Sequence, residues 1–316
     1  MSGETGPLKV FLWTSPRTVS TSFLKCMNYV PDTVAWHEPY MEIAKFSQLT
    51  EDPMVCKPCI ELLEKHGGAS EVAKIKSGYD ASDKDFDWLK EQLEGDFPGK
   101  KMVFVKEMAA SLVRESRYDK IPKGFRHTFL IRNPHKLMKS QLKVLVKSQK
   151  GGSDNMFKKN RDHPNRVRPL QYLNELWKYV KAEGLESRPV IIDIDDLLEN
   201  PKEMLEAYCK EVGIPFTEDL LTWPAGDDVM TKIWMVPKQT ILTFRSIGLH
   251  DATFASTGFQ TKSSTANGDS SSAEAELTKQ VSTIVPPMWK STVSQMLDRE
   301  MPYYEELHAE RLTLEK

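Results

Sequence analysis

The stretch that decides the fold is KVFLWTSPRTVSTSFLKCMNYV, residues 9–30 of a chain of 316 residues. Its first part, Lys9–Trp13, is a short apolar run that Ser15-Pro16 brings to an end, and such a run is typical of a buried strand. A turn rich in serine and threonine follows. Between Phe23 and Val30 apolar side chains then recur at helical spacing. The chain therefore begins with a strand, a polar loop and a helix.

The same alternation continues along the chain. Further strands are predicted at Thr33–Trp36, Lys101–Val105, His127–Ile131 and Arg188–Ile192. Further helices are predicted over Leu137–Val146 and Pro201–Val212. Strands that alternate with helices imply crossover connections in a parallel sheet. The predicted fold class is therefore α/β, a parallel sheet flanked by helices.

The composition is that of one folded domain. Hydrophobic residues make up 40% of the chain, which is enough to bury a substantial core. Length alone would permit one large α/β domain or two small ones, and we expect residues 1–316 to form a single α/β domain. The segment KSSTANGDSSSA at 262–273 has the composition of a flexible segment. From Glu274 onward we expect a helical tail that packs back onto the domain.

Charge and hydropathy exclude two classes of partner. The formal net charge is −2, whereas wholesale nucleic-acid binding usually requires a strong basic excess. No run approaches the ~20 apolar residues needed to cross a bilayer. The N-terminal MSGETGPLK also lacks the apolar segment of a signal peptide. We expect a cytoplasmic protein that binds neither nucleic acid nor membranes, and the sequence does not indicate an oligomeric state.

The chain has four cysteines. Two of them, Cys56 and Cys59, form a C-x-x-C that would suit a redox pair or half of a zinc site. No second C-x-x-C follows, and His66 is the only extra ligand nearby. Two ordinary thiols near a helix start are the simpler interpretation, and no metal site is predicted.

The loop between the first strand and the first helix, Thr14–Thr21, is a candidate anion site. Backbone N–H groups at a helix N-terminus favour an anion, and the guanidinium of Arg17 offers donors that suit phosphate or sulfate oxygens. Thr18, Ser20 and Thr21 add hydroxyl groups. Helix capping explains the hydroxyl residues equally well. The loop is not a Walker A motif, because it contains no glycine.

A second candidate segment follows the strand at His127–Ile131. Arg132 ends that strand and so lies at the edge of a parallel sheet where ligands bind. Asn133 and Pro134 suit the start of a helix, and Ser140 lies about two turns into it, within reach of the same bound group. A capped helix with a surface arginine is the alternative.

Together these segments resemble the P-loop-type sulfotransferases that use 3′-phosphoadenosine 5′-phosphosulfate (PAPS). The family loop P-[KR]-S-G-[ST]-T, which binds the 5′-phosphosulfate, is similar to Pro16–Thr21. The family signature R-[ND]-P-x(5)-S, which binds the 3′-phosphate, is matched by Arg132–Ser140. The stretch Ile194–Leu197 with Asn200-Pro201 is similar to the family's Y-E-D-L…P, and Val212–Phe216 to its F-L-G-I ending.

The resemblance implies a fold, a donor and a reaction. The fold would be of the P-loop NTPase-like, sulfotransferase type. The donor would be PAPS, and the residues expected to bind it are Arg17, Thr18, Ser20, Thr21, Arg132 and Ser140. The reaction would transfer a sulfuryl group to a hydroxyl or amine of a small-molecule acceptor.

Two departures from the family pattern bear on the site. Val19 stands where the family loop has a glycine, and we expect the loop to avoid a left-handed conformation there. The loop WTSPRTVSTS and the element HEPY are similar to a variant subgroup of the family. After Lys106-Glu107 the chain continues with Met108, whereas related chains place a histidine shortly downstream. A histidine base from this strand is therefore absent.

Transfer of a sulfuryl group needs a base for the acceptor proton and positive charge at the leaving oxygen. Arg17 is the candidate for that charge. Glu38 is the candidate base, because it follows the second strand and because the carbohydrate and tyrosine sulfotransferases that the chain resembles use a glutamate at the corresponding place. Strand alternation would aim the adjacent His37 the opposite way. Glu107 is the alternative base, and Lys106 is a second charge for the transferred group.

Two other functions stay open. Asp193, Asp195 and Asp196 follow an apolar run and would suit Mg²⁺ in a phosphotransferase or nucleotide hydrolase, but no Walker A lysine completes such a site. A sulfuryl group carries less charge than a phosphoryl group, so its transfer does not require a metal. The remaining alternative is a non-catalytic nucleotide-binding or interaction protein, which Val19 and the missing histidine leave open.

Overall fold

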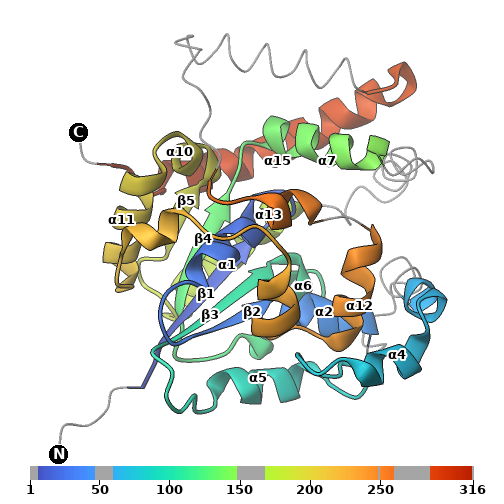
Figure 1. Cartoon of the computed structure of the whole chain (residues 1–316). Helices are drawn as coiled ribbons and strands as arrows, with labels where there is room; N and C mark the ends of the chain where they lie inside the picture. The colour runs from blue at the N-terminus through green and yellow to red at the C-terminus, as the bar shows by residue number, and fades with distance from the viewer. Residues whose placement is uncertain (1–5, 47–59, 148–167, 248–249, 260–284, 315–316) are drawn as a thin grey trace, which may run out of the picture.

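The computed structural model describes residues 6–46, 60–147, 168–247, 250–259 and 285–314. Its strands are β1 (Leu8–Thr14), β2 (Thr33–His37), β3 (Met102–Met108), β4 (Arg126–Ile131) and β5 (Val190–Asp193). They form one five-stranded sheet in the order β2-β3-β1-β4-β5, and every pair is parallel. The predicted α/β class with a parallel sheet is therefore confirmed (Figure 1).

The helices follow the strands in the order that the sequence predicts. After β1 comes α1 (Ser20–Met27), after β4 comes α7 (Pro134–Lys147), and α11 (Pro201–Val212) has the predicted bounds. The other helices are α2 (Pro39–Phe46), α4 (Gly68–Lys74), α5 (Phe86–Glu94), α6 (Ala110–Val113), α9 (Pro169–Ala182), α10 (Ile194–Glu199), α12 (Lys238–Ile247), α13 (Asp251–Ala255) and α15 (Lys290–Ala309).

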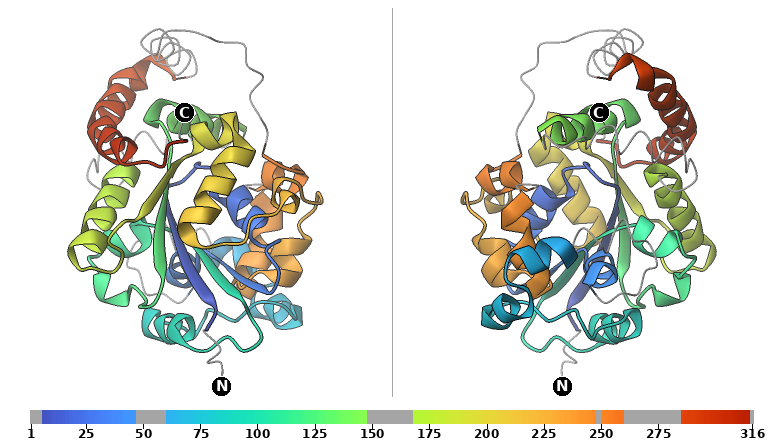
Figure 2. Two further views of the ribbon diagram at one scale, coloured as in Figure 1. Left: turned by 90° about the vertical axis from the view of Figure 1, so that its left-hand side faces the viewer. Right: turned by 90° about the vertical axis from the view of Figure 1, so that its right-hand side faces the viewer.

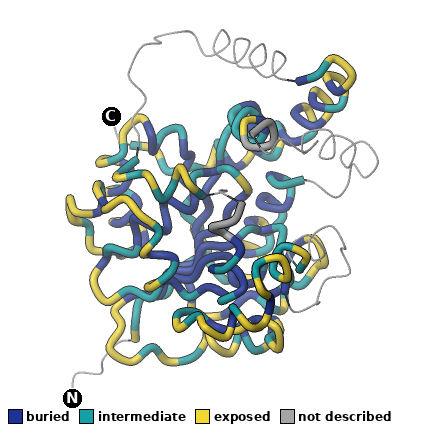
Figure 3. The backbone as a smooth tube through the Cα atoms, turned by 45° about the vertical axis from the view of Figure 1, so that its right-hand side comes forward, coloured by how far each residue is buried: buried dark blue, intermediate teal, exposed yellow. Residues whose placement is uncertain are grey.

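Both faces of the sheet are covered, which is why the strands read as continuous apolar runs. Along β1, Val10 and Leu12 belong to one core, and Phe11 and Trp13 belong to the other. The first core is filled by α1, α10, α11 and α12, and the second by α2, α5, α6, α9 and α15. Helices therefore lie on both sides of the sheet (Figure 2), and the strands form the buried centre (Figure 3).

The C-terminal helix α15 packs back onto the domain. Met296 and Leu297 of α15 join Met138 and Leu142 of α7 in a small separate core. The carboxylate of Glu300 accepts a hydrogen bond from the backbone N–H of Leu170 at 2.8 Å, which ties α15 to the start of α9. The predicted flexible segment at 262–273 lies outside the described residues, and the single-domain assignment stays a prediction.

No helix in the described part of the chain is long and apolar enough to cross a membrane.

Candidate nucleotide and transfer site

The carboxyl ends of the parallel strands open onto a cavity of ≈ 560 Å³. Such an edge is where open α/β sheets bind ligands, because the loops after several strands converge there. Seven of the residues predicted for the site line the cavity: Arg17, Ser20, Thr21, Glu38, Lys106, Arg132 and Ser140. The fold therefore brings into one cavity residues that lie far apart in the sequence.

The loop between β1 and α1 takes a left-handed conformation at two positions. The φ angle is 69° at Arg17 and 59° at Val19. The prediction that Val19 would avoid this conformation is wrong. Val19 adopts a left-handed backbone that glycine would take without strain, at a steric cost of about 1–2 kcal/mol. Its partly buried side chain packs against the first core, which offsets part of that cost.

The N-terminus of α1 faces the cavity with its amide groups uncapped by a side chain. Val19, the residue before the helix, makes no side-chain cap hydrogen bond, and Ser20, Thr21 and Ser22 line the cavity. The first N–H groups of a helix lack intrahelical partners and favour an anion. Thr18 is placed differently: it is fully buried, and its hydroxyl donates to the carbonyl of Ser15 at 2.8 Å.

Arg17 contacts both Arg132 and Ser140. The Nη1 of Arg132 donates to the carbonyl oxygen of Arg17 at 2.8 Å, and the Nε of Arg17 donates to the Ser140 hydroxyl at 3.3 Å. The Nε of Arg132 is buried and has no hydrogen-bond partner among the described residues. Burial, followed by the charge of Arg132, lowers the pKa of Arg17. Two adjacent guanidinium groups in a cavity favour a bound anion.

Glu38 and Lys106 form a buried ion pair that also lines the cavity. The backbone N–H of Glu38 donates to the carbonyl of Lys106 at 2.7 Å, which fixes the end of β2 against β3. Burial alone would raise the pKa of Glu38, but the charges of Lys106, His37 and Lys45 outweigh it and lower that pKa well below its ordinary value. In the free protein Glu38 is therefore an ionised carboxylate held by an ammonium group.

His37 lies near Glu38 and does not point away from it. The Nε2 of His37 is 3.8 Å from a carboxylate oxygen of Glu38, so the prediction from strand alternation is wrong. Alternation applies within a strand, whereas Glu38 follows the end of β2 with a φ angle of 46°. The ring of His37 stacks on Trp234 at 5.5 Å. Burial lowers the pKa of His37 well below its ordinary value.

Glu107 lies behind this pair and does not line the cavity. Its carboxylate accepts hydrogen bonds from the backbone N–H groups of Tyr40 at 2.6 Å, Met41 at 3.2 Å and Met108 at 2.7 Å. It therefore holds the first turn of α2. Burial raises the pKa of Glu107 to about 8, the charge of Glu38 adds to the rise, and the backbone donors oppose it.

The structure adds cavity residues that the sequence did not single out. Lys45 lies on α2 and pairs with Glu42 at 2.6 Å. His250 lies edge-on to His37 with ring centroids 5.7 Å apart. Burial lowers the pKa of His250 to about 4, so it is neutral at pH 7. Neither residue belongs to a recognisable motif, because each reaches the cavity only through tertiary packing.

The carboxylates considered for Mg²⁺ are engaged in structural contacts. Asp193 accepts from the N–H of Asp195 at 2.7 Å and from the hydroxyl of Tyr304 at 2.7 Å. Asp195 pairs with Lys136 at 3.0 Å, and Asp196 accepts from Arg311 at 2.7 Å. These contacts fix the start of α10 and the end of α15 beside Arg132.

The cysteines give no support for a redox pair within the described residues. Cys26 and Cys209 are free and buried, and burial raises the pKa of the Cys26 thiol well above its ordinary value. The C-x-x-C residues Cys56 and Cys59 lie outside the described residues.

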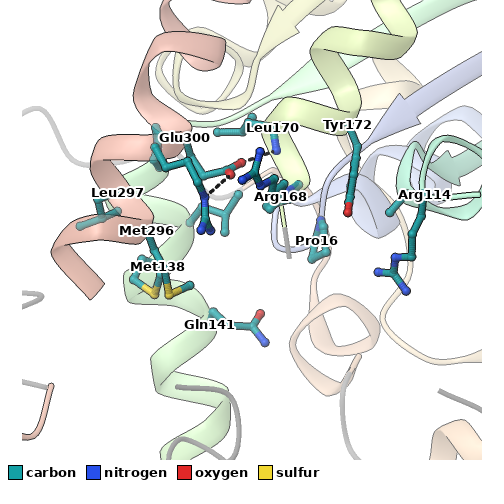
Figure 4. A pocket seen from close by; sticks show the side chains of 15 residues that line it. Pro16, Arg114, Met138, Gln141, Arg168, Leu170, Tyr172, Met296, Leu297 and Glu300 are labelled. Atoms are coloured by element: carbon teal, nitrogen blue, oxygen red, sulfur yellow. Dashed lines mark hydrogen bonds and ion pairs between the residues drawn. The ribbon is translucent and has the colours of Figure 1, made fainter. Parts of the chain in front are cut away.

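A second, smaller cavity of ≈ 190 Å³ adjoins the first. The two share Pro16 and Gln141 as lining residues. The smaller one lies between α7, α9 and α15, with Met138 and Met296 on one side and Arg114 and Tyr172 on the other (Figure 4). Its wall is largely apolar, so it suits a compact hydrophobic group.

Comparison with known proteins bears on the family. Residues 182–262 match the family model described as a sulfotransferase domain. The resemblance to sulfotransferases is confirmed. The match includes the Ile194–Leu197 and Val212–Phe216 motifs, and it supports a sulfotransferase-type activity. No curated protein matches the chain significantly.

Three solved structures resemble this sulfotransferase-like chain over most of its length. The sulfotransferase domain from the Synechococcus PCC 7002 olefin synthase is 14% identical, with 94% of this chain and 95% of that chain covered and a TM-score of 0.41. The sulfotransferase domain from the curacin biosynthetic pathway is 15% identical, with coverages of 93% and 98% and a TM-score of 0.44. A sulfotransferase from Alicyclobacillus acidocaldarius is 14% identical, with coverages of 79% and 94% and a TM-score of 0.37.

Proposed function

We propose that this protein transfers a sulfuryl group from PAPS to a hydroxyl or amine of a small-molecule acceptor. The observation that carries the proposal is one cavity in which two guanidinium groups and a helix N-terminus lie together with the Glu38–Lys106 pair. The guanidinium groups and the helix end suit the anionic donor, and the ion pair supplies a carboxylate and an ammonium group for the transfer.

The residues present fit a nucleotide that carries two phosphate-type groups. The cavity volume of ≈ 560 Å³ lies within the about 300–1,000 Å³ of small-molecule sites. Arg17 lies at the N-terminus of α1 and donates to Ser140, and Arg132 donates to the carbonyl of Arg17, so the two guanidinium groups offer neighbouring sites for two anionic groups. The buried Nε of Arg132, which lacks a protein partner among the described residues, is a donor that a bound phosphate would satisfy.

The donor supplies an activated sulfuryl group, whose S–O bond to phosphate breaks as the new S–O or S–N bond to the acceptor forms. Arg17 stabilises the negative charge that develops on the leaving phosphate oxygen. Lys106 holds the oxygens of the transferred group. Glu38 takes the proton that the acceptor hydroxyl or amine releases. Arg132 and Ser140 bind the 3′-phosphate and so orient the whole donor.

The Glu38–Lys106 pair makes the base dependent on the donor. While Lys106 is paired with Glu38, the pKa of Glu38 is held low and the carboxylate is a weak base. A sulfuryl group beside Lys106 would also interact with that ammonium group and so weaken the effect of its charge on the pKa of Glu38. The pKa of Glu38 then rises towards its ordinary value, and the carboxylate becomes a better proton acceptor once the donor is bound.

The acceptor fits in the adjoining cavity. Because the two cavities share Pro16 and Gln141, a molecule in the smaller cavity has a route towards Glu38. The apolar side chains Leu137, Met138, Met296 and Leu297 line the smaller cavity, so the acceptor would carry its hydroxyl or amine on a compact hydrophobic body.

The deciding experiment is calorimetric titration of the protein with 3′,5′-bisphosphoadenosine, with AMP, and with ATP in the presence and absence of Mg²⁺. Preference for the bisphosphate without metal is the expected result. Preference for Mg-ATP would instead indicate phosphoryl transfer, and tight bisphosphate binding without transfer to any acceptor would indicate a non-catalytic nucleotide-binding protein.

A further inference from the structure

A completely buried lysine lies behind the nucleotide cavity. Lys25 is in the last turn of α1 and its side chain has no exposed surface. Its Nζ lies 3.3 Å from the carbonyl oxygen of Ser256 and 3.4 Å from the carbonyls of Gly226, Thr253 and Phe254. Within the described residues no carboxylate pairs with it. Burial lowers the pKa of Lys25.

The carbonyl groups that surround Lys25 belong to the backbone behind one wall of the cavity. Residues Ala252, Thr253, Ser256, Gly258 and Phe259 line the cavity, and we call them the distal wall. Three of the four carbonyls lie at the C-terminal end of α13 or just after it. Lysine side chains favour such ends, because the last carbonyls of a helix lack partners and carry partial negative charge.

The distal wall has further attachments to the domain. They include the backbone hydrogen bond from Trp223 to Thr257 at 3.0 Å, the bridge between Thr222 and Gly258, and the packing of Phe259 against Phe23 and Trp223. Ser22 of α1 donates to the Thr253 hydroxyl at 3.4 Å, and the N–H of Gly226 donates to the carbonyl of Phe254 at 2.7 Å. The indole of Trp223 donates to the Ser256 hydroxyl at 3.1 Å. In Figure 1, α13 lies beside α1, and the hydrogen bond between Ser22 and Thr253 connects the two helices. Lys25 alone reaches four carbonyls from two segments.

The helix α1 therefore has a different role at each end. Its N-terminus faces the predicted anion site, and its last turn holds the distal wall through Lys25. The distance between the anion site and the distal wall is thus set by one rigid helix. An ammonium group suits this position because it donates to several carbonyls at once, whereas a methionine of similar length would remove this donor from all four of them.

We propose that Lys25 is a positioning residue that holds the distal wall in place against the bound donor. This inference rests on the proposed function, because it takes the occupant of the cavity to be that donor. Lys25 does not line the cavity, so its effect on binding passes through the wall.

The test is Lys25→Met, with Cys26→Ala as the matched control. Cys26 is the next residue of α1, is equally buried, and contacts the carbonyl of Leu220 instead of the distal wall. Two ligands are titrated: 3′,5′-bisphosphoadenosine, which spans the cavity, and inorganic pyrophosphate, which needs only the anion site. Amide hydrogen exchange over residues 250–259 is measured in the free protein.

Lys25→Met should weaken bisphosphate binding by about tenfold or more, leave pyrophosphate binding unchanged, and speed exchange over residues 250–259. Cys26→Ala should lower stability without changing the ratio of the two affinities. Equal losses for both ligands, or an unchanged bisphosphate affinity with unchanged exchange, would overturn the assignment of Lys25. A wild-type protein that binds pyrophosphate but not the bisphosphate would instead refute the proposed function.

Trp223→Phe provides a second variant if Lys25→Met does not fold. It removes the hydrogen bond between the indole and Ser256 while leaving Lys25 in place. The expected effect has the same direction and is smaller. An unchanged ratio of bisphosphate to pyrophosphate affinity in this variant would contradict a role for the distal wall in nucleotide binding.

Discussion

Arg132 donates a hydrogen bond of 2.8 Å to the carbonyl oxygen of Arg17, across 115 positions of sequence. This bond joins the end of β4 to the loop after β1 and places two guanidinium groups at the start of α1. Because Arg132 fixes the backbone of Arg17, the positive charges in the cavity are held in place. Charges at fixed positions can distinguish nucleotides that differ in where their phosphate groups lie.

Arg132→Ala should weaken the binding of 3′,5′-bisphosphoadenosine far more than that of AMP, because only the bisphosphate carries a 3′-phosphate. Loss of hydrogen bonds to a charged group costs about 1.5–3 kcal/mol, which corresponds to about 10- to 100-fold in affinity. Calorimetric titration of both nucleotides measures the difference. Equal losses for the two would show that Arg132 supports the loop without binding the 3′-phosphate.

Glu38→Gln should leave nucleotide affinity nearly unchanged and abolish transfer, because the amide cannot take the acceptor proton. Turnover with PAPS and a panel of hydroxyl and amine acceptors measures the effect. Glu107→Gln is the matched control. It should lower stability, since Glu107 accepts from the backbone of α2, and it should retain transfer. Activity that survived in Glu38→Gln and vanished in Glu107→Gln would make Glu107 the base.

Val19→Gly should be more stable than Val19→Ala by about 1 kcal/mol, because glycine alone relieves the left-handed backbone. Both variants lose the packing of the valine methyl groups, so comparing the two isolates the φ angle of 59°. Urea unfolding gives the two free energies of unfolding. The usual order in helices, with alanine more stable than glycine, would show that the loop does not hold residue 19 in this conformation.

Acid should destabilise the protein partly through His127. Burial lowers its pKa to about 4, and its Nδ1 accepts a hydrogen bond from the indole of Trp13 at 3.0 Å. As the pH falls, His127 in the unfolded chain therefore binds a proton at a higher pH than His127 in the folded chain does. The contribution of His127 to the free energy of unfolding is fully present above its unfolded pKa of 6.5. It falls by on the order of 3 kcal/mol as the pH drops towards 4.

The variant His127→Asn tests that assignment. Its amide oxygen replaces Nδ1 as acceptor, but it does not titrate. The variant should be less stable at pH 7, because the ring is lost from the core, and its free energy of unfolding should fall less steeply between pH 6.5 and 4. The same slope in both proteins would place the acid sensitivity in other groups.

Met296→Trp should fill part of the smaller cavity and exclude hydrophobic acceptors. Met296 lines that cavity and is buried, whereas Met288 nearby in the chain is 76% exposed. Met288→Trp is therefore the control for the added indole. We expect a raised KM for acceptors with an apolar body in Met296→Trp alone, with bisphosphate affinity unchanged in both. Unchanged acceptor kinetics would place the acceptor elsewhere.

The sequence alone determined the order of the elements and the identity of seven residues that line the cavity. Short apolar runs predicted the five strands. Arg17 and Arg132 were predicted because ligands bind where parallel strands end, and Ser140 because it lies two turns into the helix that follows. These properties depend on the local periodicity of apolar residues and on the rule that ligands bind at the carboxyl ends of parallel strands. Both can be applied to the sequence without a structure.

Only the tertiary structure decided the roles of individual side chains. Val19 and Glu38 both take positive φ angles, which the residue type disfavours and the surrounding packing imposes. Glu38 lines the cavity whereas Glu107 holds α2, although both are glutamates at strand ends. Lys25 meets four carbonyls more than 200 positions away along the chain. Such contacts depend on long-range packing, and no local pattern of residues encodes them.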